Sequence, residues 1–173
     1  MNNFKYSIPT TIYFGRDQLD HLAELKEKGT KVLLVYGGGS IKRSGLYDAV
    51  MKILKESGLS VTELSGVEPN PRIESVRKGV VLCRENQIEM VLAVGGGPVT
   101  DCAKVVAAGA CYDGDAWDLV LDGGKITKAL PVYSVLTLSA TGSEMDNFAV
   151  ISDMSKNEKW GTGSPLVKPG MSI

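Results

Sequence analysis

An apolar run ends in three glycines at residues 91–98, which read Val91-Leu92-Ala93-Val94-Gly95-Gly96-Gly97-Pro98. The pattern also occurs at residues 32–40, where Val32-Leu33-Leu34-Val35-Tyr36 precedes Gly37-Gly38-Gly39-Ser40. A buried parallel strand that ends in glycines and leads into a helix presents unobstructed backbone N–H groups, and the helix N-terminus adds partial positive charge. Two such turns predict a dinucleotide or a similarly long phosphorylated ligand. The alternative is that the glycines only turn a strand into a helix.

The composition indicates one domain with a small-molecule ligand. The chain has 173 residues, 43% of them apolar, which is enough for one hydrophobic core. Nineteen Lys and Arg balance 20 Asp and Glu without a block of like charge, so we expect no nucleic-acid partner. No apolar run approaches the roughly 18 residues of a membrane helix, and no secretory leader is apparent. We therefore expect a single cytoplasmic domain over residues 1–173 that contacts no membrane.

The cysteines and the single histidine do not form a metal-binding pattern. Cys83, Cys102 and Cys111 lack CxxC spacing and fall in apolar helical patterns, so we predict buried thiols without a disulfide or zinc. His21 lies in the amphipathic run 17–28, where it should face solvent or pack against a helix. We predict no metal site in this chain.

Strand-like and helical patterns alternate along the chain, as they do in βαβ units. We predict strands at 11–14, 32–36, 60–64, 90–94, 132–135 and 149–152, and helices at 17–28, 42–57, 71–85 and 98–111. Ser40 should cap the second helix and Gly58 should end it. Asn70 should cap the third helix, and Pro71 and Pro98 suit first helical turns. The alternation predicts an α/β fold with a mostly parallel sheet.

The glycine turns match neither common phosphate-binding fingerprint. Read as G-x-G-x-x-G, residues 37–42 and 95–100 both lack the third glycine. A Walker A sequence is also absent, which argues against a P-loop NTPase.

The segment from Gly95 to Lys104 reads GGGPVTDCAK, which resembles the GGGSxxDxAK pattern of the iron-containing (group III) alcohol dehydrogenases. Three more segments agree in order. Residues 65–71 (SGVEPNP) match the family's G-V-x-P-N-P loop, residues 137–145 (TLSATGSEM) match T-x-x-A-T-G-S-E, and residues 3–15 match the P-T-x-I-x-F-G opening. The first glycine turn, GGGSIK, is most similar to the butanol dehydrogenase-like branch.

The resemblance implies a Rossmann-like fold with helices on both faces of the sheet. It implies an NAD(P)H-dependent alcohol dehydrogenase or aldehyde reductase that transfers a hydride between nicotinamide and a small alcohol or aldehyde. The family's metal, iron or zinc, is held by a helical C-terminal domain that we expect to be absent here. We therefore expect the cofactor-binding half of an enzyme, with no catalytic residue in this chain and no activity alone. Family members form dimers, so an edge strand at 11–14 or 149–152 is expected to pair with a second copy.

The resemblance also implies roles for individual residues in cofactor binding. The adenosine phosphate is expected at Gly38, Gly39 and Ser40, and the pyrophosphate at Gly95, Gly96 and Gly97. The nicotinamide side is expected at Asp101, Thr137, Leu138, Thr141 and Ser143, with Asn70 near the adenine and Lys159 reaching toward the nucleotide. A carboxylate in the first helical turn also suits Asp101 physically. The alternatives are a helix-start charge for Asp101, a plain N-cap for Asn70 and a solvated Lys159.

The first glycine turn favours NADP, although NAD is possible. It lacks an acidic residue that would repel a 2′-phosphate, and Ser40, Lys42 and Arg43 offer a hydroxyl and two cations. The alternative is that both cations are ordinary solvated helix residues.

Two positions depart from the family pattern. Pro98 replaces a serine, which removes an N–H and a hydroxyl from the phosphate-binding turn. Asp146 replaces an asparagine, which places a negative charge where the nicotinamide carboxamide is expected.

Other functions remain open. A glycerol dehydrogenase-like enzyme or a dehydroquinate synthase shares the GGGxxxD turn. A non-catalytic nucleotide-binding module and a structural α/β interaction domain are alternatives of other classes.

Overall fold

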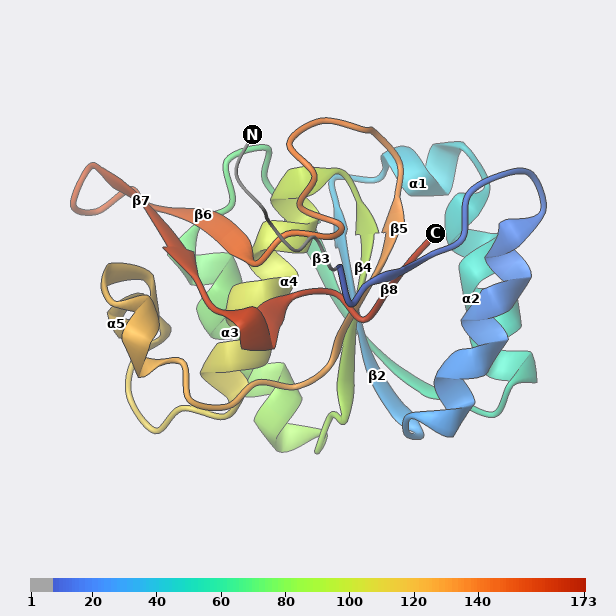
Figure 1. Ribbon diagram of the computed structural model, residues 1–173, viewed down its shortest axis with the longest axis horizontal. Coiled ribbons are helices and arrows are strands. Elements are labelled where there is room, and N and C mark those ends of the chain that lie inside the picture. The colour runs from blue at the N-terminus through green and yellow to red at the C-terminus, as the bar shows by residue number, and fades with distance from the viewer. Residues whose placement is uncertain (1–7) are drawn as a thin grey trace, which may run out of the picture.

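The computed structural model describes residues 8–173, so residues 3–7 of the opening motif lie outside the described part of the chain. A parallel sheet of six strands forms the middle layer, in the order β1-β8-β5-β4-β2-β3. Helices cover both of its faces, and a separate antiparallel hairpin, β6-β7, lies beyond α4 at one end (Figure 1). The predicted Rossmann-like α/β fold is confirmed.

The elements have the following bounds. The large sheet contains β1 (Thr11–Ile12), β2 (Lys31–Gly37), β3 (Ser60–Val67), β4 (Met90–Gly95), β5 (Val132–Leu136) and β8 (Met171–Ser172). The hairpin contains β6 (Phe148–Asp153) and β7 (Glu158–Gly163). The α-helices are α1 (Ser40–Arg43), α2 (Leu46–Glu56), α3 (Ile73–Glu85), α4 (Gly97–Ala110) and α5 (Ala116–Leu121). The 3-10 helices are η1 (Gln18–Glu27), η2 (Gly123–Lys125) and η3 (Pro165–Val167).

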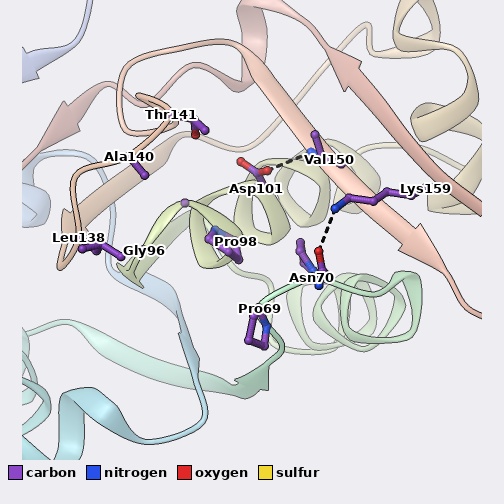
Figure 2. Close-up of a pocket in the computed structure, with 12 residues that line it drawn as sticks. Pro69, Asn70, Gly96, Pro98, Asp101, Leu138, Ala140, Thr141, Val150 and Lys159 are labelled. Atoms are coloured by element: carbon purple, nitrogen blue, oxygen red, sulfur yellow. Dashed lines mark hydrogen bonds between the residues drawn. The ribbon is translucent and has the colours of Figure 1, made fainter.

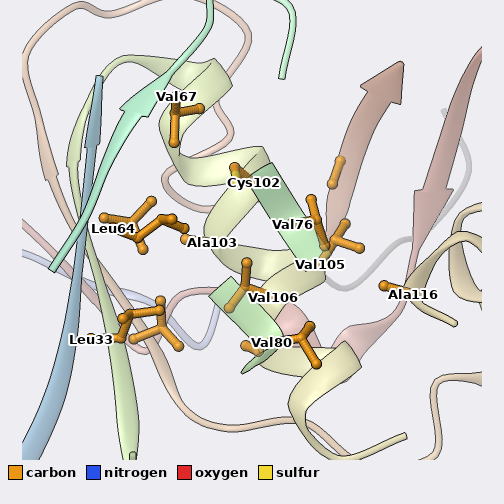
Figure 3. Close-up of a cluster of buried hydrophobic side chains, with 14 of the residues drawn as sticks. Leu33, Leu64, Val67, Val76, Val80, Cys102, Ala103, Val105, Val106 and Ala116 are labelled. Atoms are coloured by element: carbon orange, nitrogen blue, oxygen red, sulfur yellow. The ribbon is translucent and has the colours of Figure 1, made fainter. Parts of the chain in front are cut away.

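Two hydrophobic clusters lie on opposite faces of the sheet. Successive side chains of a strand point to opposite faces, so the apolar strands β2 and β4 contribute to both clusters. Leu33 and Val91 pack on the face covered by α3 and α4, in the cluster that Figure 3 shows. Their neighbours Val32 and Leu92 pack on the other face, with residues of η1 and α2. The near-continuous apolar runs in these strands follow from this burial on both sides.

Glycines allow α3 and α4 to approach closely. A Cβ added to Gly79 in α3 would lie 2.6 Å from Val106 Cγ2, and one added to Gly109 in α4 would lie 2.6 Å from Val80 Cγ2. Neither distance is tolerable, so both positions require glycine unless the helices move apart.

The predicted helix at 42–57 is wrong in its continuity. It is broken into α1 and α2 at Gly45, which adopts a φ of +80°. Ser40 is the first residue of α1 rather than its cap, and Gly39 stands at the N-cap position with a φ of +107°. The predicted end of the helix is confirmed, because Gly58 follows the C-cap residue Ser57 with a φ of +79°.

Several other boundaries differ from the predictions. The run at 17–28 forms the 3-10 helix η1, and the strand at 11–14 is shortened to β1. Helix α3 starts after Arg72, so Asn70 is not its cap and Pro71 lies outside it. The strand at 149–152 belongs to the hairpin and not to the parallel sheet, because it pairs with β7. The remaining elements that the sequence patterns did not reveal are α5, η2, β7, η3 and β8.

The thiols and the histidine mostly lie as expected. Cys83 and Cys102 are buried, and burial raises the pKa of each to about 12. The prediction of a buried Cys111 is wrong, because this residue is partly exposed at the end of α4. His21 stacks on Tyr13 at a ring separation of 3.6 Å. No helix within residues 8–173 has both the length and the apolar character needed to cross a membrane.

Candidate functional site

The strand order creates a crevice between β2 and β4. From β2 the chain crosses to β3 on one side, and it then returns to form β4 on the other side of β2. Connections that leave in opposite directions open a crevice at the carboxyl ends of two adjacent parallel strands, where α/β proteins commonly bind ligands. Each of these two strands ends in one of the triple-glycine turns.

Two adjoining pockets occupy this edge of the sheet. One, which we call the Asp101 pocket, has a volume of about 240 Å³ and includes Lys159 in its lining (Figure 2). The other, the Gly38 pocket, has a volume of about 470 Å³ and also contacts Glu68. Their shared lining residues are Pro69, Gly96, Pro98 and Leu138. Together the pockets form one elongated groove that crosses both glycine turns.

Nine of the predicted site residues line this groove. They are Gly38, Asn70, Gly96, Gly97, Asp101, Thr137, Leu138, Thr141 and Lys159. Within the described part of the chain, four predicted residues lie outside its lining: Gly39, Ser40, Gly95 and Ser143. The lining residues that sequence reasoning did not assign to the site include Pro69, Ala140 and Val150. Pro69 and Ala140 fall inside the two family-like segments, whereas nothing in the sequence around Val150 indicates a site.

The second glycine turn leads directly into α4. Gly97 is the first residue of the helix and Pro98 the second, a position that tolerates proline. The N–H groups of Val99 and Thr100 both donate to the Gly96 carbonyl oxygen. Because Pro98 has no N–H, the first turn of α4 offers a ligand the N–H of Gly97.

Asp101 lies in the groove with both carboxylate oxygens hydrogen-bonded. Oδ1 accepts from Ser143 Oγ at 2.6 Å, and Oδ2 accepts from the Val150 N–H at 3.0 Å (Figure 2 shows the second bond). The interpretation of Asp101 as a first-turn residue is wrong, since it is the fifth residue of α4. Burial raises the pKa of Asp101, and the bonds from Ser143 and Val150 and the charge of Lys104 oppose that rise.

Lys104 is fully buried below the groove, at 0% exposure. Its ammonium group donates to Asp146 Oδ1 at 2.7 Å, the Phe148 carbonyl oxygen at 2.8 Å and Ser143 Oγ at 3.0 Å. Burial lowers the pKa of Lys104, while the hydrogen bond and the charge of Asp146 raise it. The Oδ1 of Asp146, which was expected near the nicotinamide carboxamide, is thus turned toward Lys104.

Lys159 and Asn70 join the hairpin to the loop before α3. Lys159 Nζ donates to Asn70 Oδ1 at 2.8 Å, and both residues line the Asp101 pocket (Figure 2). Lys159 is exposed, yet this contact holds its ammonium group at the groove. A cation at this place suits an anionic ligand.

The two cations after the first glycine turn lie in different surroundings. Lys42 Nζ sits over the rings of Tyr36 and Tyr47, 5.1 and 4.5 Å from their centroids. Arg43 instead approaches Gly39, since its Nη1 lies 3.9 Å from the place a Cβ on that glycine would take. Arg43 is therefore the better placed of the two for a ligand at the turn.

No group of three or more His, Cys, Asp or Glu side chains within residues 8–173 is arranged to hold a metal ion.

Comparison with known proteins gives consistent results. The family model for iron-containing alcohol dehydrogenase matches residues 9–173. NADH-dependent butanol dehydrogenase A of Clostridium acetobutylicum is 58% identical over 174 residues, which cover 100% of this chain and 45% of that protein. NADPH-dependent aldehyde reductase YqhD of Escherichia coli is 43% identical over 176 residues, which cover 100% of this chain and 45% of that protein.

The fold also matches a solved structure. The crystal structure of NADH-dependent butanol dehydrogenase A from Thermotoga maritima superposes with a TM-score of 0.94 at 48% identity, covering 100% of this chain and 44% of that one. This chain therefore spans a little under half the length of the relatives it matches.

Proposed function

This chain belongs to the iron-containing alcohol dehydrogenase family, and we propose that it is the dinucleotide-binding part of an enzyme that interconverts small alcohols and aldehydes. The observation that carries the proposal is the continuous groove across both glycine turns at the β2–β4 crevice. We propose residues 1–173 as one dinucleotide-binding domain, because a single sheet with helices on both faces contributes to the two larger hydrophobic clusters. The named activities of the relatives favour this enzyme class over a glycerol dehydrogenase.

The groove residues have separate proposed roles. Gly38, Gly39 and Ser40 bind the adenosine phosphate, and Gly96 and Gly97 bind the pyrophosphate with Gly95 completing the turn. Asp101 accepts from ribose hydroxyls, which its remaining lone pairs permit. Thr137, Leu138 and Thr141 line the nicotinamide side, Ser143 supports Asp101, and Lys159 with Asn70 closes the groove over the nucleotide. When bound, the nicotinamide supplies or accepts the hydride exchanged with the substrate carbonyl carbon.

We propose NADP as the preferred cofactor. Arg43 beside Gly39 and the absence of an acidic side chain from residues 37–43 support this choice. Of the three relatives named above, two are NADH-dependent and one is NADPH-dependent by name. The proposal therefore rests on the first glycine turn and not on the relatives.

A titration of the chain with NADPH and NADH, followed by nicotinamide fluorescence, tests the proposal. Transfer of the nicotinamide into a groove should raise its fluorescence in a saturable manner, with the lower Kd for NADPH. An unchanged fluorescence together with no heat of binding in calorimetry would contradict the proposed function.

Two further proposals concern the oligomeric state of the protein and its location in the cell. Ile12 and Phe14, exposed by 45% and 96%, lie at the edge strand β1 and support pairing with a second copy. Light scattering should give twice the monomer mass, and a monomer at high concentration would contradict this.

The three free cysteines support a reducing, cytoplasmic location, which fractionation of the host cells tests.

A further inference from the structure

Lys104 is a charged residue in an unusual place. Lysine is almost never fully buried unless its charge is paired, yet Lys104 is 0% exposed in the middle of α4. Its three bonds to Asp146, Phe148 and Ser143 use all three donors of the ammonium group. A buried cation with every donor used can hold the groups around it in one arrangement.

The partners of Lys104 belong to the wall of the groove. Ser143 accepts from Lys104 and donates to Asp101, so it links the two α4 side chains, which lie three residues apart on the same helix face. Asp146 Oδ1 also accepts from the Phe148 N–H at 2.8 Å. One ammonium group thereby joins α4, the segment that carries Ala140 and Thr141, and the start of β6.

We propose that Lys104 is a positioning residue for the dinucleotide groove: through Ser143 it orients the carboxylate of Asp101, and through Asp146 and Phe148 it holds the loop wall against α4. The inference rests on the proposed function, because the ligand is a nicotinamide dinucleotide whose ribose hydroxyls Asp101 accepts. Lys104 itself does not line the groove.

The charges around Asp101 make this role measurable. Asp101 lies near the charges of Lys104 on α4 and Asp146 on the loop that follows β5, and it shares the pocket lining with Lys159 of β7. Glu144, on the same loop as Asp146, acts on Lys104. Asp101 and Asp146 thus share one buried cation. Removal of that cation, or of the Ser143 hydroxyl, raises the pKa of Asp101, because both favour its ionised form. As the pH falls, binding that needs the ionised carboxylate of Asp101 is then lost at a higher pH than in the wild type.

The test compares Lys104→Met and Ser143→Ala with Lys52→Met, which alters a lysine on α2 whose side chain is 72% exposed. The Kd for NADPH is measured from pH 5 to pH 8, and circular dichroism checks folding. Lys104→Met and Ser143→Ala should each weaken binding about tenfold at neutral pH, the effect of one lost hydrogen bond to a charged group. Both should shift the acid limb of binding to higher pH, and Lys52→Met should change neither quantity.

The outcomes separate the two proposals. If the wild type binds neither NADPH nor NADH, the proposed function fails and this inference fails with it. If the wild type binds and the folded variants keep its Kd and its acid limb, only the positioning role is overturned. If Lys104→Met does not fold, Ser143→Ala alone tests the positioning role. This substitution removes the link to Asp101 but leaves the buried ion pair of Lys104 and Asp146 in place.

Discussion

Arg43 and Lys42 are neighbours in sequence, but the structure gives them different surroundings. The Lys42 ammonium lies over Tyr36 and Tyr47, whose hydroxyls both donate to Glu63. The Nη1 of Arg43 instead lies 3.9 Å from the place that a Cβ on Gly39 would take. A 2′-phosphate at the first glycine turn would therefore meet Arg43.

This difference predicts how the cofactor preference responds to substitution. Arg43→Met should weaken NADPH binding about tenfold, because it removes a charge-assisted contact to the 2′-phosphate. Ser40→Asp should do the same by repulsion, and NADH affinity should be unchanged in both, since NADH lacks that phosphate. Lys42→Met is the matched control and should keep the preference. Parallel titrations measure all three, and an NADPH preference that survives in Ser40→Asp would contradict the assignment.

Single residues also mark the limit of what the sequence could predict. Asp101 and the glycines stand in local patterns, so they could be predicted from their neighbours. The partners of Asp101 and Lys104 could not, because Ser143 and Asp146 are about 40 residues away along the chain. Only the tertiary packing of the loop against α4 reveals that Asp146, expected to face the cofactor, pairs with a buried lysine.

At the scale of elements, the contact between α3 and α4 depends on glycine. Gly79→Ala would place a methyl group 2.6 Å from Val106 Cγ2 and 2.9 Å from Leu64 Cδ2. Overpacking of this kind costs about 1–3 kcal/mol, and the better helix propensity of alanine offsets about 1 kcal/mol or less. We expect a net loss of about 1–2 kcal/mol in the free energy of unfolding.

Urea unfolding measures this loss. Gly38→Ala is the control, because a Cβ there has no atom within 4 Å and should leave the free energy of unfolding unchanged. A Gly79→Ala variant as stable as the wild type would show that the two helices can separate at little cost.

The elements with a long apolar pattern could be predicted from the sequence, and those without one could not. The strands β2 and β4 are buried on both faces, so their long apolar runs identify them in the sequence. The break in the helix at Gly45 could not be predicted from the apolar pattern. That pattern continues through Gly45, although the backbone there takes a positive φ. The strand predicted at 11–14 is present as the shorter β1. The two-residue strand β8 is too short for any periodicity, and it exists because it pairs with β1 and β5.

At the scale of the whole molecule, the order of strands brings the two glycine turns together. About 58 residues separate them in sequence, yet β2 and β4 are adjacent and parallel, so both turns lie at one edge of the sheet. The alternation of strands and helices predicts a parallel sheet. It does not predict the neighbours of each strand, so the groove follows from the topology and not from either motif alone.

A crystal structure of the chain with bound NADPH tests the central claim most directly. The account predicts the pyrophosphate against Gly96 and Gly97, the nicotinamide ribose beside Asp101 and the 2′-phosphate near Arg43. A dinucleotide bound outside the groove, for example in the pocket of about 480 Å³ beside Gly15 and Ile173, would contradict it.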